Sequence, residues 1–278
     1  MAAKGMFVDT SICTGCKACQ VACKQWNELS AEPSHFQYDA KRGFNVAVNF
    51  TGDSYDNTGR LSATDWRHVR FVEQFSEDRT QGRWLFMSDS CKHCAQAGCM
   101  EACPVDAIIR RADTGNVFIL QDKCIGCRYC IAACPFGVIG YSELDGKVHK
   151  CTLCDDRIHA GLGTACAKAC PTGSIEFGDV DQLRTKATVR LAALKNAGQD
   201  KAQLYGADPN GDLNGLNVFY LLMDKPSVYG QPDKPVLPQT RLPFSAGLTV
   251  VAAAVTGLAA LINFRNRGMT AKAKEATR

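Results

Sequence analysis

Four cysteines in the middle of the chain constrain its fold more than any other feature. Cys124, Cys127, Cys130 and Cys134 are separated by two, two and three residues, and Pro135 follows. In bacterial iron–sulfur proteins this spacing holds [4Fe-4S] clusters, with the first three thiolates on one cluster and the fourth on another. We expect the fourth cysteine to open a helix that leads away from the loop of the first three. A second run of cysteines must then supply the missing ligand.

Three further runs of four cysteines repeat the pattern and complete the 16 cysteines of the chain. The first run keeps the spacing but has Lys24 in place of the proline, whereas the middle gap widens to four residues in the second run and to eleven in the fourth. Disulfide frameworks are usually scattered along a chain and not grouped in this way. The additional runs are Cys13, Cys16, Cys19 and Cys23; Cys91, Cys94, Cys99 and Cys103; and Cys151, Cys154, Cys166 and Cys170.

Exchange of the fourth cysteine between paired runs predicts four [4Fe-4S] clusters. The first and fourth runs give set A, formed by Cys13, Cys16, Cys19 and Cys170, and set B, formed by Cys23, Cys151, Cys154 and Cys166. The second and third runs give set C, formed by Cys91, Cys94, Cys99 and Cys134, and set D, formed by Cys103, Cys124, Cys127 and Cys130. Zinc is the main competing metal, because Cys-x2-Cys pairs also make tetrahedral zinc sites. Zinc sites do not need three thiols at this spacing followed by Cys-Pro.

Short apolar segments flank the cysteine runs and indicate an α+β fold of two ferredoxin-like modules, each with two clusters. We expect residues 1–40 and 141–178 to form the first module and residues 66–140 the second. Residues 41–65 are rich in Gly, Asn, Asp and Thr and predict a loop insertion. The expected strands are Phe7-Val8, Val69–Phe71, Trp84–Met87 and Val218–Leu222, with a hairpin around Thr114-Gly115-Asn116.

The remainder of the chain predicts a helix–strand extension, a tether and a membrane anchor. In the extension, residues 179–223, apolar residues at helical spacing predict a helix over Asp179–Gln199. Five prolines in residues 224–243 predict an extended, semi-rigid tether. Residues 244–264 carry no charge, and a helix of that length, rising about 1.5 Å per residue, spans a bilayer core of about 30 Å. The alternative is a buried soluble helix, but the proline tether before it and the basic tail 265–278 after it favour a transmembrane helix.

No stretch of the sequence predicts a catalytic site. There is no glycine-rich loop before a helix for a nucleotide, no nucleophile constellation, and no histidine in the apolar span to ligate haem. The net charge of +4 is too weak to indicate nucleic acid. The N-terminus lacks an apolar core of signal-peptide length, so we expect that this chain does not direct its own export.

Several side chains beside the cysteines have two possible roles. Basic residues near cluster sulfurs raise reduction potentials, but for each one singly we expect a solvated side chain. Trp26 is expected to pack in the core, and His93 is a possible substitute ligand that the complete cysteine count does not need. The basic residues are Lys17, Lys24, Lys92, Lys123, Arg128, Lys150 and Lys168.

Four such runs in this order resemble the iron–sulfur subunits of molybdopterin oxidoreductases and some hydrogenases. Within this group the chain is similar to the β subunit of membrane-bound respiratory formate dehydrogenase, although residues 42–64 depart from that family's pattern. The resemblance covers nearly the whole chain, including its single C-terminal span. It rests on the stretches Cys13–Asn27, Cys124–Phe136, Lys150–Arg157 and Cys166–Gly173.

This resemblance implies a complex in which the chain is an electron-transfer subunit without a catalytic site of its own. A catalytic α subunit with a molybdenum or tungsten pterin would oxidise formate, and a membrane cytochrome b γ subunit would reduce quinone. Export with a signal-bearing α subunit implies an inner-membrane protein with periplasmic clusters and a cytoplasmic tail. Two alternatives stay open: the equivalent subunit of a hydrogenase or of a nitrate, sulfoxide or polysulfide reductase, and a zinc-stabilised membrane adaptor without a redox role.

Overall fold

A four-stranded sheet joins distant parts of the sequence at the centre of the first structural unit. The computed structural model describes residues 3–30, 36–39, 44–47, 56 and 60–276 and divides into the units Met1–Val236 and Leu237–Arg278. The sheet has the order β10 (Ile175–Asp179), β1 (Lys4–Asp9), β12 (Val218–Leu222) and β11 (Gln203–Tyr205). β1 pairs antiparallel with β10 and parallel with β12, and β11 pairs antiparallel with β12. All residues of β12 are buried, which confirms the buried strand predicted there.

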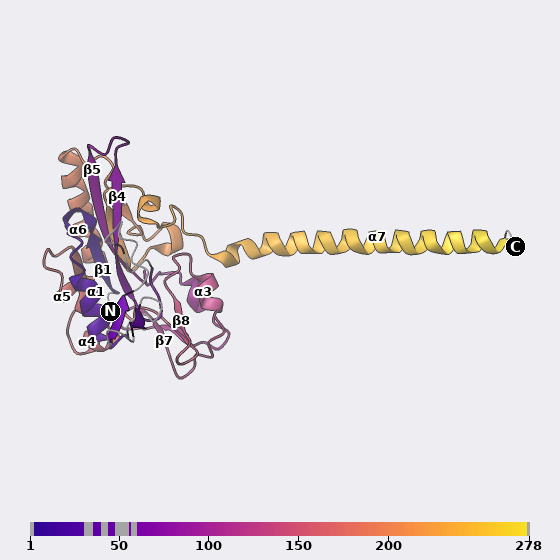
Figure 1. Ribbon diagram of the computed structural model, residues 1–278, viewed down its shortest axis with the longest axis horizontal. Coiled ribbons are helices and arrows are strands. Elements are labelled where there is room, and N and C mark those ends of the chain that lie inside the picture. The colour runs from indigo at the N-terminus through magenta and orange to yellow at the C-terminus, as the bar shows by residue number, and fades with distance from the viewer. Residues whose placement is uncertain (1–2, 31–35, 40–43, 48–55, 57–59, 277–278) are drawn as a thin grey trace. The chain divides into compact units, whose positions relative to one another are not determined.

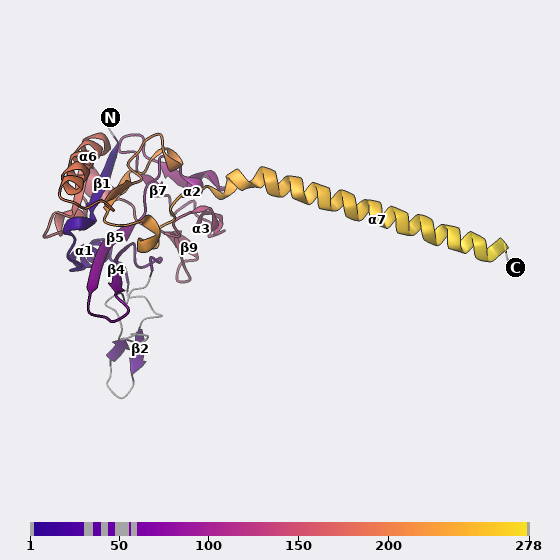
Figure 2. The same cartoon turned by 90° about the horizontal axis from the view of Figure 1, so that it is seen from above.

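Helix α6 (Val180–Asn196) covers this sheet beside β1, as Figures 1 and 2 show. Its buried side chains are Val180, Leu183 and Ala187, which are spaced at three and four residues and therefore share one face. The amphipathic helix predicted over Asp179–Gln199 is confirmed. Leu191 and Leu194 are only partly buried, so the packed face covers the first part of the helix.

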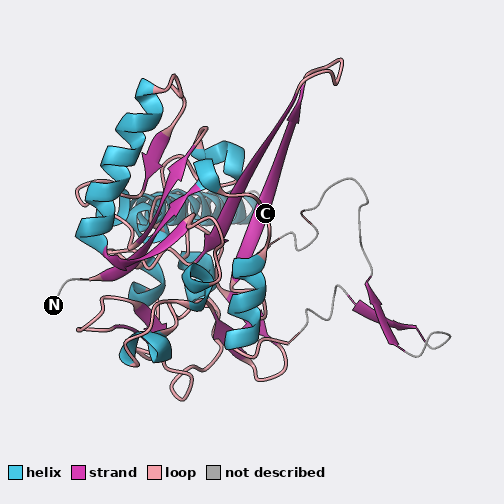
Figure 3. Ribbon diagram, turned by 90° about the vertical axis from the view of Figure 1, so that its left-hand side faces the viewer, coloured by secondary structure: helices cyan, strands magenta, loops and turns pink. Residues whose placement is uncertain are grey.

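Antiparallel hairpins form the remaining strands. β4 (Arg67–Phe75) and β5 (Gly82–Ser90) make a long hairpin that projects upward in Figures 1 and 3, and its base is buried. The predicted hairpin around Gly115 is confirmed as β6 (Ile108–Arg110) and β7 (Val117–Ile119), with Gly115 in the left-handed region at a φ of 72°. β8 (Gly140–Ser142) pairs with β9 (Lys147–His149).

The segment predicted as a loop insertion contains a strand. β3 (Phe44–Ala47) pairs with β2 (Phe36–Asp39), so an antiparallel hairpin crosses the expected start of the insertion. The alternation of Phe44 and Val46 with polar residues is a short strand pattern. Residues 40–43, 48–55 and 57–59 of this segment lie outside the described residues.

Short helices carry many of the cysteines, and their starting points differ from the prediction. They are α1 (Ala18–Trp26), α2 (Gly98–Glu101), α3 (Tyr129–Ala133), α4 (Asp155–His159) and α5 (Ala165–Lys168). α1 and α3 begin just before the third cysteine of their runs, not at the fourth. Lys17 and Arg128, the residues before these helices, adopt left-handed backbone conformations and turn the chain from the cysteine loop into the helix.

The proline-rich segment is not the extended tether that its composition predicts. A short 3-10 helix, η4 (Pro226–Tyr229), folds back so that Tyr229 is buried and its hydroxyl accepts a hydrogen bond from the backbone N–H of Met223. Gln231 is also buried and donates to the Asp89 carboxylate. These hydrogen bonds, one of them to the distant Asp89, fold the segment onto the first unit, which proline content alone does not indicate.

The second unit contains the apolar helix. A 3-10 turn, η5 (Pro238–Arg241), leads into α7 (Leu242–Ala276), which is therefore longer than the predicted span. The stretch Gly247–Arg265 of this helix has 19 residues and a mean hydropathy of 1.9, and none of its residues is buried. Its length and composition suit a membrane span. One further 3-10 helix, η1 (Thr10–Ile12), follows β1 in the first unit, and another, η3 (Asp212–Asn214), precedes β12.

Candidate metal centres

The thiols of set C lie together, although they come from two runs. Cys91 follows β5, Cys99 lies on α2, and Cys134 caps the C-terminus of α3. Burial raises the pKa of Cys94 well above its ordinary value, and the charges of Cys91, Cys134 and Cys99 add to the rise. All four line one cavity.

Set D is arranged in the same way around Cys130. Burial raises the pKa of Cys130 to about 11, and the neighbouring Cys127, Cys124 and Cys103 contribute to the rise. These four thiols also line one cavity. α2 packs against α3 beside these two sets.

Set B gathers around Cys23 on α1. Burial raises the pKa of this thiol well above its ordinary value, and Cys151, Cys166 and Cys154 add to the effect. The four thiols line a third cavity. Pairing of β1 with β10 and packing of α1 on α5 bring the first run to the fourth run.

Set A, like set D, has one exposed, two partly buried and one buried cysteine. Cys13 interacts electrostatically with Cys170 and Cys16, and Cys19 interacts with Cys13. Cys16 is exposed, whereas Cys13 and Cys170 are partly buried. The structure thus brings together the members of each set, and all 16 thiols are free of disulfide bonds.

The chemistry of these thiols fits a multinuclear cluster. Metal ligation requires thiolates, yet burial and mutual repulsion disfavour several negative sulfurs in one cavity. Positive iron ions remove that penalty, and backbone N–H groups add to the stabilisation. Ala107 donates to the sulfur of Cys103 at 3.3 Å, and Leu153 donates to that of Cys151 at 3.4 Å. Within the described ranges, no group of three or more His, Cys, Asp or Glu side chains is arranged to hold a single metal ion.

Electrostatic interactions between thiols of different sets give a linear order that the sequence does not indicate. Set A meets set B where Cys19 interacts with Cys166. Sets B and C meet where Cys151 interacts with Cys91, and sets C and D meet where Cys99 interacts with Cys130. The order is therefore A, B, C, D, and each end has one exposed cysteine, Cys16 or Cys127.

Two of the seven basic residues beside the runs are buried, contrary to the expectation of solvated side chains. Lys92 and Lys150 are 0% and 2% exposed and line the cavity of set C. Lys92 forms an ion pair with Asp89, whereas Lys150 donates to the carbonyl oxygens of Val117 and Cys151.

The other five basic residues are exposed or partly buried. Lys123, Arg128 and Lys168 are exposed, as expected. Lys17 and Lys24 are partly buried, with Lys17 over the ring of Phe71 at 5.0 Å and Lys24 paired with Asp65 at 3.0 Å.

Trp26 differs from its expected position, and His93 lies beside the thiols of set C. Trp26 is 44% exposed, so its expected place in the core is wrong; its Nε1–H donates to Asp156 at 2.8 Å and Arg157 covers its ring. His93 is buried at the cavity of set C, and its Nδ1 accepts from the backbone N–H of Val117 at 3.0 Å. Burial holds its pKa well below the ordinary value, so His93 is a neutral neighbour of the four thiols.

Arg67 is a residue at this site that the sequence analysis missed. It is 1% exposed and lines the cavity of set B. It lies far from any cysteine run in the sequence, and only the pairing of β4 with β5 brings it to the thiols. The only sequence feature that could have pointed to Arg67 is its place at the start of an apolar strand. Arginines are too common at such positions for this feature to predict a role beside the thiols.

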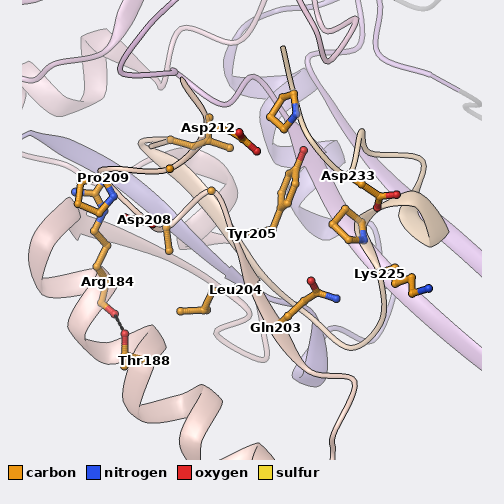
Figure 4. A pocket seen from close by; sticks show the side chains of 16 residues that line it. Arg184, Thr188, Gln203, Leu204, Tyr205, Asp208, Pro209, Asp212, Lys225 and Asp233 are labelled. Atoms are coloured by element: carbon orange, nitrogen blue, oxygen red, sulfur yellow. Dashed lines mark hydrogen bonds between the residues drawn. The ribbon is translucent and has the colours of Figure 1, made fainter. Parts of the chain in front are cut away.

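A cavity of about 810 Å³ lies apart from the metal centres. Figure 4 shows it between α6, which contributes Arg184 and Thr188, and the strand around Tyr205. Its charged side chains have both signs, with Asp208, Asp212 and Asp233 opposing Arg184 and Lys225. No cysteine lines it, so it has no part in the cluster chemistry.

Comparisons with known proteins agree with this chemistry. Two family models, both described as a 4Fe-4S dicluster domain, match residues 12–107 and 82–180. The formate dehydrogenase-O iron–sulfur subunit of Escherichia coli strain K12 is 41% identical over 84% of this chain and 72% of that protein. The formate dehydrogenase iron–sulfur subunit of Haemophilus influenzae is 40% identical over 92% of this chain and 77% of that protein. The B subunit of the anaerobic dimethyl sulfoxide reductase of E. coli is 35% identical over 66% of this chain and 76% of that protein.

These matches remove the zinc adaptor as an alternative, because the matching families carry iron–sulfur clusters. They also agree with the lack of a catalytic motif, since the relatives are iron–sulfur subunits and not catalytic ones. The 16 cysteines and two dicluster domains correspond to four [4Fe-4S] clusters. The chain belongs to the family of formate dehydrogenase iron–sulfur subunits, electron-transfer proteins of oxidoreductase complexes.

Proposed function

We propose that this subunit passes electrons one at a time between a formate-oxidising partner and a membrane partner, along the path A, B, C, D. The observation that carries the proposal is the unbroken series of electrostatic interactions Cys19–Cys166, Cys151–Cys91 and Cys99–Cys130, which join each set to the next. A cluster supplies reversible one-electron chemistry when it is bound. The exposed cysteine at each end of the series supports electron entry at one end and exit at the other.

Each set holds one [4Fe-4S] cluster through its four thiolates. This ligand assignment is supported by the cavities of sets B, C and D, each lined by all four of its cysteines, and by the contacts of Cys13 in set A. The buried walls exclude water, and backbone N–H groups such as that of Ala107 donate to ligand sulfurs. Both effects stabilise the bound cluster and tune its potential.

The two pairs of sets correspond to two ferredoxin-like modules. Pairing of β1 with β10 supports a first module built from residues 1–40 and 141–178, and the α2–α3 contact supports a second module within 66–140. The module boundaries and the extension 179–223 follow the sequence expectation. The folded contacts of Tyr229 and Gln231 move the boundary of the first unit beyond the expected tether start at 224.

The partners follow from the formate dehydrogenase relatives. The catalytic α subunit contains a molybdenum or tungsten pterin and oxidises formate, and the membrane γ subunit is a cytochrome b that reduces quinone. Relatives that match 84–92% of the chain at 39–41% identity are formate dehydrogenase subunits, whereas the sulfoxide reductase relative matches 66% at 35%. This difference in coverage favours formate over the sulfoxide alternative.

Helix α7 anchors the subunit in the inner membrane as a single span. The apolar stretch Gly247–Arg265 supports the anchor, and the basic residues that follow it support a cytoplasmic C-terminus. The clusters then face the periplasm, where a signal-bearing α subunit would bring them.

Anaerobic purification of the complex through a tag on this chain tests the proposal. We expect a pterin subunit and a cytochrome b to copurify, and formate to reduce the clusters of this chain, as followed by EPR. Inactivation of the pterin subunit is the matched control and should abolish reduction by formate but not by dithionite. Copurification of a nickel–iron subunit, with reduction by hydrogen and not by formate, would assign the chain to a hydrogenase instead.

A further inference from the structure

Arg67 is a fully buried cation on β4 whose side chain is hydrogen-bonded to the neighbouring strand β5. It is the first residue of β4 and stands opposite Ser90 of β5. Its guanidinium donates to the hydroxyl oxygen of Ser88 at 2.8 Å and to that of Ser90 at 3.0 Å. Both hydroxyls are buried, so the hairpin fixes the orientation of the side chain.

The charge of Arg67 has no carboxylate partner. In the part of the chain that the structure describes, no Asp or Glu forms an ion pair with it, and its Nε–H has no hydrogen-bond acceptor. Of the buried lysines near the thiols, Lys92 is paired with Asp89 and Lys150 donates to the carbonyl oxygens of Val117 and Cys151. Since arginine cannot be deprotonated in proteins, the positive charge of Arg67 needs another anionic neighbour.

The groups that interact with Arg67 most strongly are cysteines of two sets: Cys166, Cys151 and Cys23 of set B, and Cys19 of set A. Arg67 also lines the cavity of set B, together with all four thiols of that set. Cys19 in turn bonds to Ser88, the same hydroxyl that orients the guanidinium.

We propose that Arg67 tunes the first half of the electron path by donating its Nε–H to a sulfur of the set B cluster and placing its positive charge between sets A and B. This inference rests on the ligand sets proposed above. A cluster that accepts one electron gains one negative charge, which a buried cation and an N–H···S bond stabilise. Arg67 therefore raises the reduction potential of the set B cluster most and that of the set A cluster less.

Redox titration of the purified complex, followed by EPR, tests this role. The set B signal is identified as the one that Cys154→Ser alters. We expect Arg67→Met to lower the reduced-to-oxidised ratio of the set B cluster at least tenfold at the wild-type midpoint, which corresponds to about 59 mV for one electron. The set A cluster should shift in the same direction by less, and the set D cluster should not shift.

The controls separate tuning from a structural role. Arg83→Met removes an arginine that pairs with Asp224 at 2.8 Å and contacts no cysteine set, so all midpoints should be retained. Unchanged set A and B midpoints in an Arg67→Met complex with all four clusters would overturn the inference and leave the ligand sets intact. Fewer than four clusters in the wild-type complex would instead contradict the ligand sets.

A conservative variant decides the case in which Arg67→Met does not retain its iron. Arg67→Lys keeps the positive charge but has no N–H at the Nε position. We expect its set B ratio to fall by about threefold, less than the loss expected for the neutral side chain. An unchanged set B midpoint in this variant would show that the Nε–H does not reach the cluster and would overturn the inference.

Discussion

The thiol of Cys134 interacts electrostatically with that of Cys91, which lies in a different cysteine run. Cys130 lies in helix α3 and Cys134 follows its last residue in an extended conformation, about 6 Å further along the helix axis. The two thiols line different cavities. Cys134 thus lines the cavity of set C although its own run supplies three thiols to set D. The proposed exchange of ligands between runs has this helix as its physical cause.

The first prediction concerns this exchange. Cys103→Ser should damage the set D cluster and spare set C, because Cys103 lines the cavity of Cys124, Cys127 and Cys130. EPR of the reduced complex measures which signal is lost. Cys99→Ser is the matched control, since Cys99 belongs to the same run but lines the cavity of set C. Loss confined to the set C signal in Cys103→Ser would refute the exchange.

The second prediction concerns the iron content. Fully loaded protein should contain about sixteen iron atoms per chain, four in each of four cubanes. Removal of iron by a chelator should also destabilise the first unit, because it leaves groups of buried thiols without their counter-charge. Iron analysis and thermal unfolding of loaded and stripped complexes measure the two effects. Three clusters or fewer in fully loaded protein would contradict the four ligand sets.

The third prediction compares two glycines in left-handed conformations. Gly126, between Cys124 and Cys127, has a φ of +67°, and an added Cβ would lie 2.0 Å from the carbonyl oxygen of Gly146. Gly137 has a φ of +61° with open space around its Cβ position. Gly137→Ala should therefore cost only the strain of the backbone, about 1 kcal/mol, whereas Gly126→Ala should also displace the cysteine loop.

The measurements for this pair are the free energy of unfolding and the EPR signal of set D. Gly126→Ala should weaken or abolish the set D signal, and Gly137→Ala should leave it intact. Equal effects of the two substitutions on set D would mean that the contact with Gly146 does not determine the loop.

Local patterns in the sequence were sufficient to predict which thiols lie together in sets B, C and D. The cysteines of each run are only a few residues apart, so their spacing is enough to predict a short loop followed by a helix. The strand at Val218–Leu222 and the hairpin around Gly115 were predictable for the same reason. A continuous apolar run predicts a buried strand, and a glycine in a short turn predicts a hairpin; both patterns are local.

Features that depend on long-range packing could not be predicted. Lys92 lies over the rings of Phe136 and Tyr220, which are distant in the sequence, and Arg67 reaches the thiols only through the pairing of β4 with β5. The proline-rich segment folds back because Tyr229 and Gln231 find partners far away in the sequence. The order of the four sets likewise depends on how the two pairs of runs pack together.

The fourth prediction tests the buried ion pair of Lys92 and Asp89. Lys92→Met leaves the Asp89 carboxylate buried without its main partner, so it should cost about 3 kcal/mol of unfolding free energy. The double variant Lys92→Met/Asp89→Asn should recover most of this loss, because the uncompensated charge is gone. Denaturant unfolding of the single and double variants gives the coupling energy. A double variant as unstable as Lys92→Met would contradict this account.

The same pair predicts a dependence of stability on pH. Burial alone would raise the pKa of Asp89, but the charge of Lys92 outweighs it and holds that pKa below its ordinary value. The pair therefore stabilises the fold above the ordinary carboxyl pKa of about 4, and this contribution is lost as the pH falls through the lowered value. Lys92→Met should remove this part of the acid sensitivity.

The last prediction concerns orientation in the membrane. After Phe264 the chain carries five Lys or Arg residues and one Glu, whereas residues 224–243 before the span carry three Lys or Arg and two Asp. Positive charge near a span marks the cytoplasmic side, and acidic residues count for little. We therefore expect the C-terminal tail in the cytoplasm and the cluster-binding unit in the periplasm, in agreement with export alongside a signal-bearing partner.

Protease treatment of intact spheroplasts measures this orientation. The protease should cut the cluster-binding unit and spare a tag placed after Arg278, because the membrane protects only the cytoplasmic side. In lysed spheroplasts both should be cut, which controls for intrinsic resistance of the tag. If the tag is digested in intact spheroplasts while the cluster-binding unit survives, the orientation is reversed. The charge difference of five against three would then be too small to set the topology, and the complex would serve cytoplasmic formate.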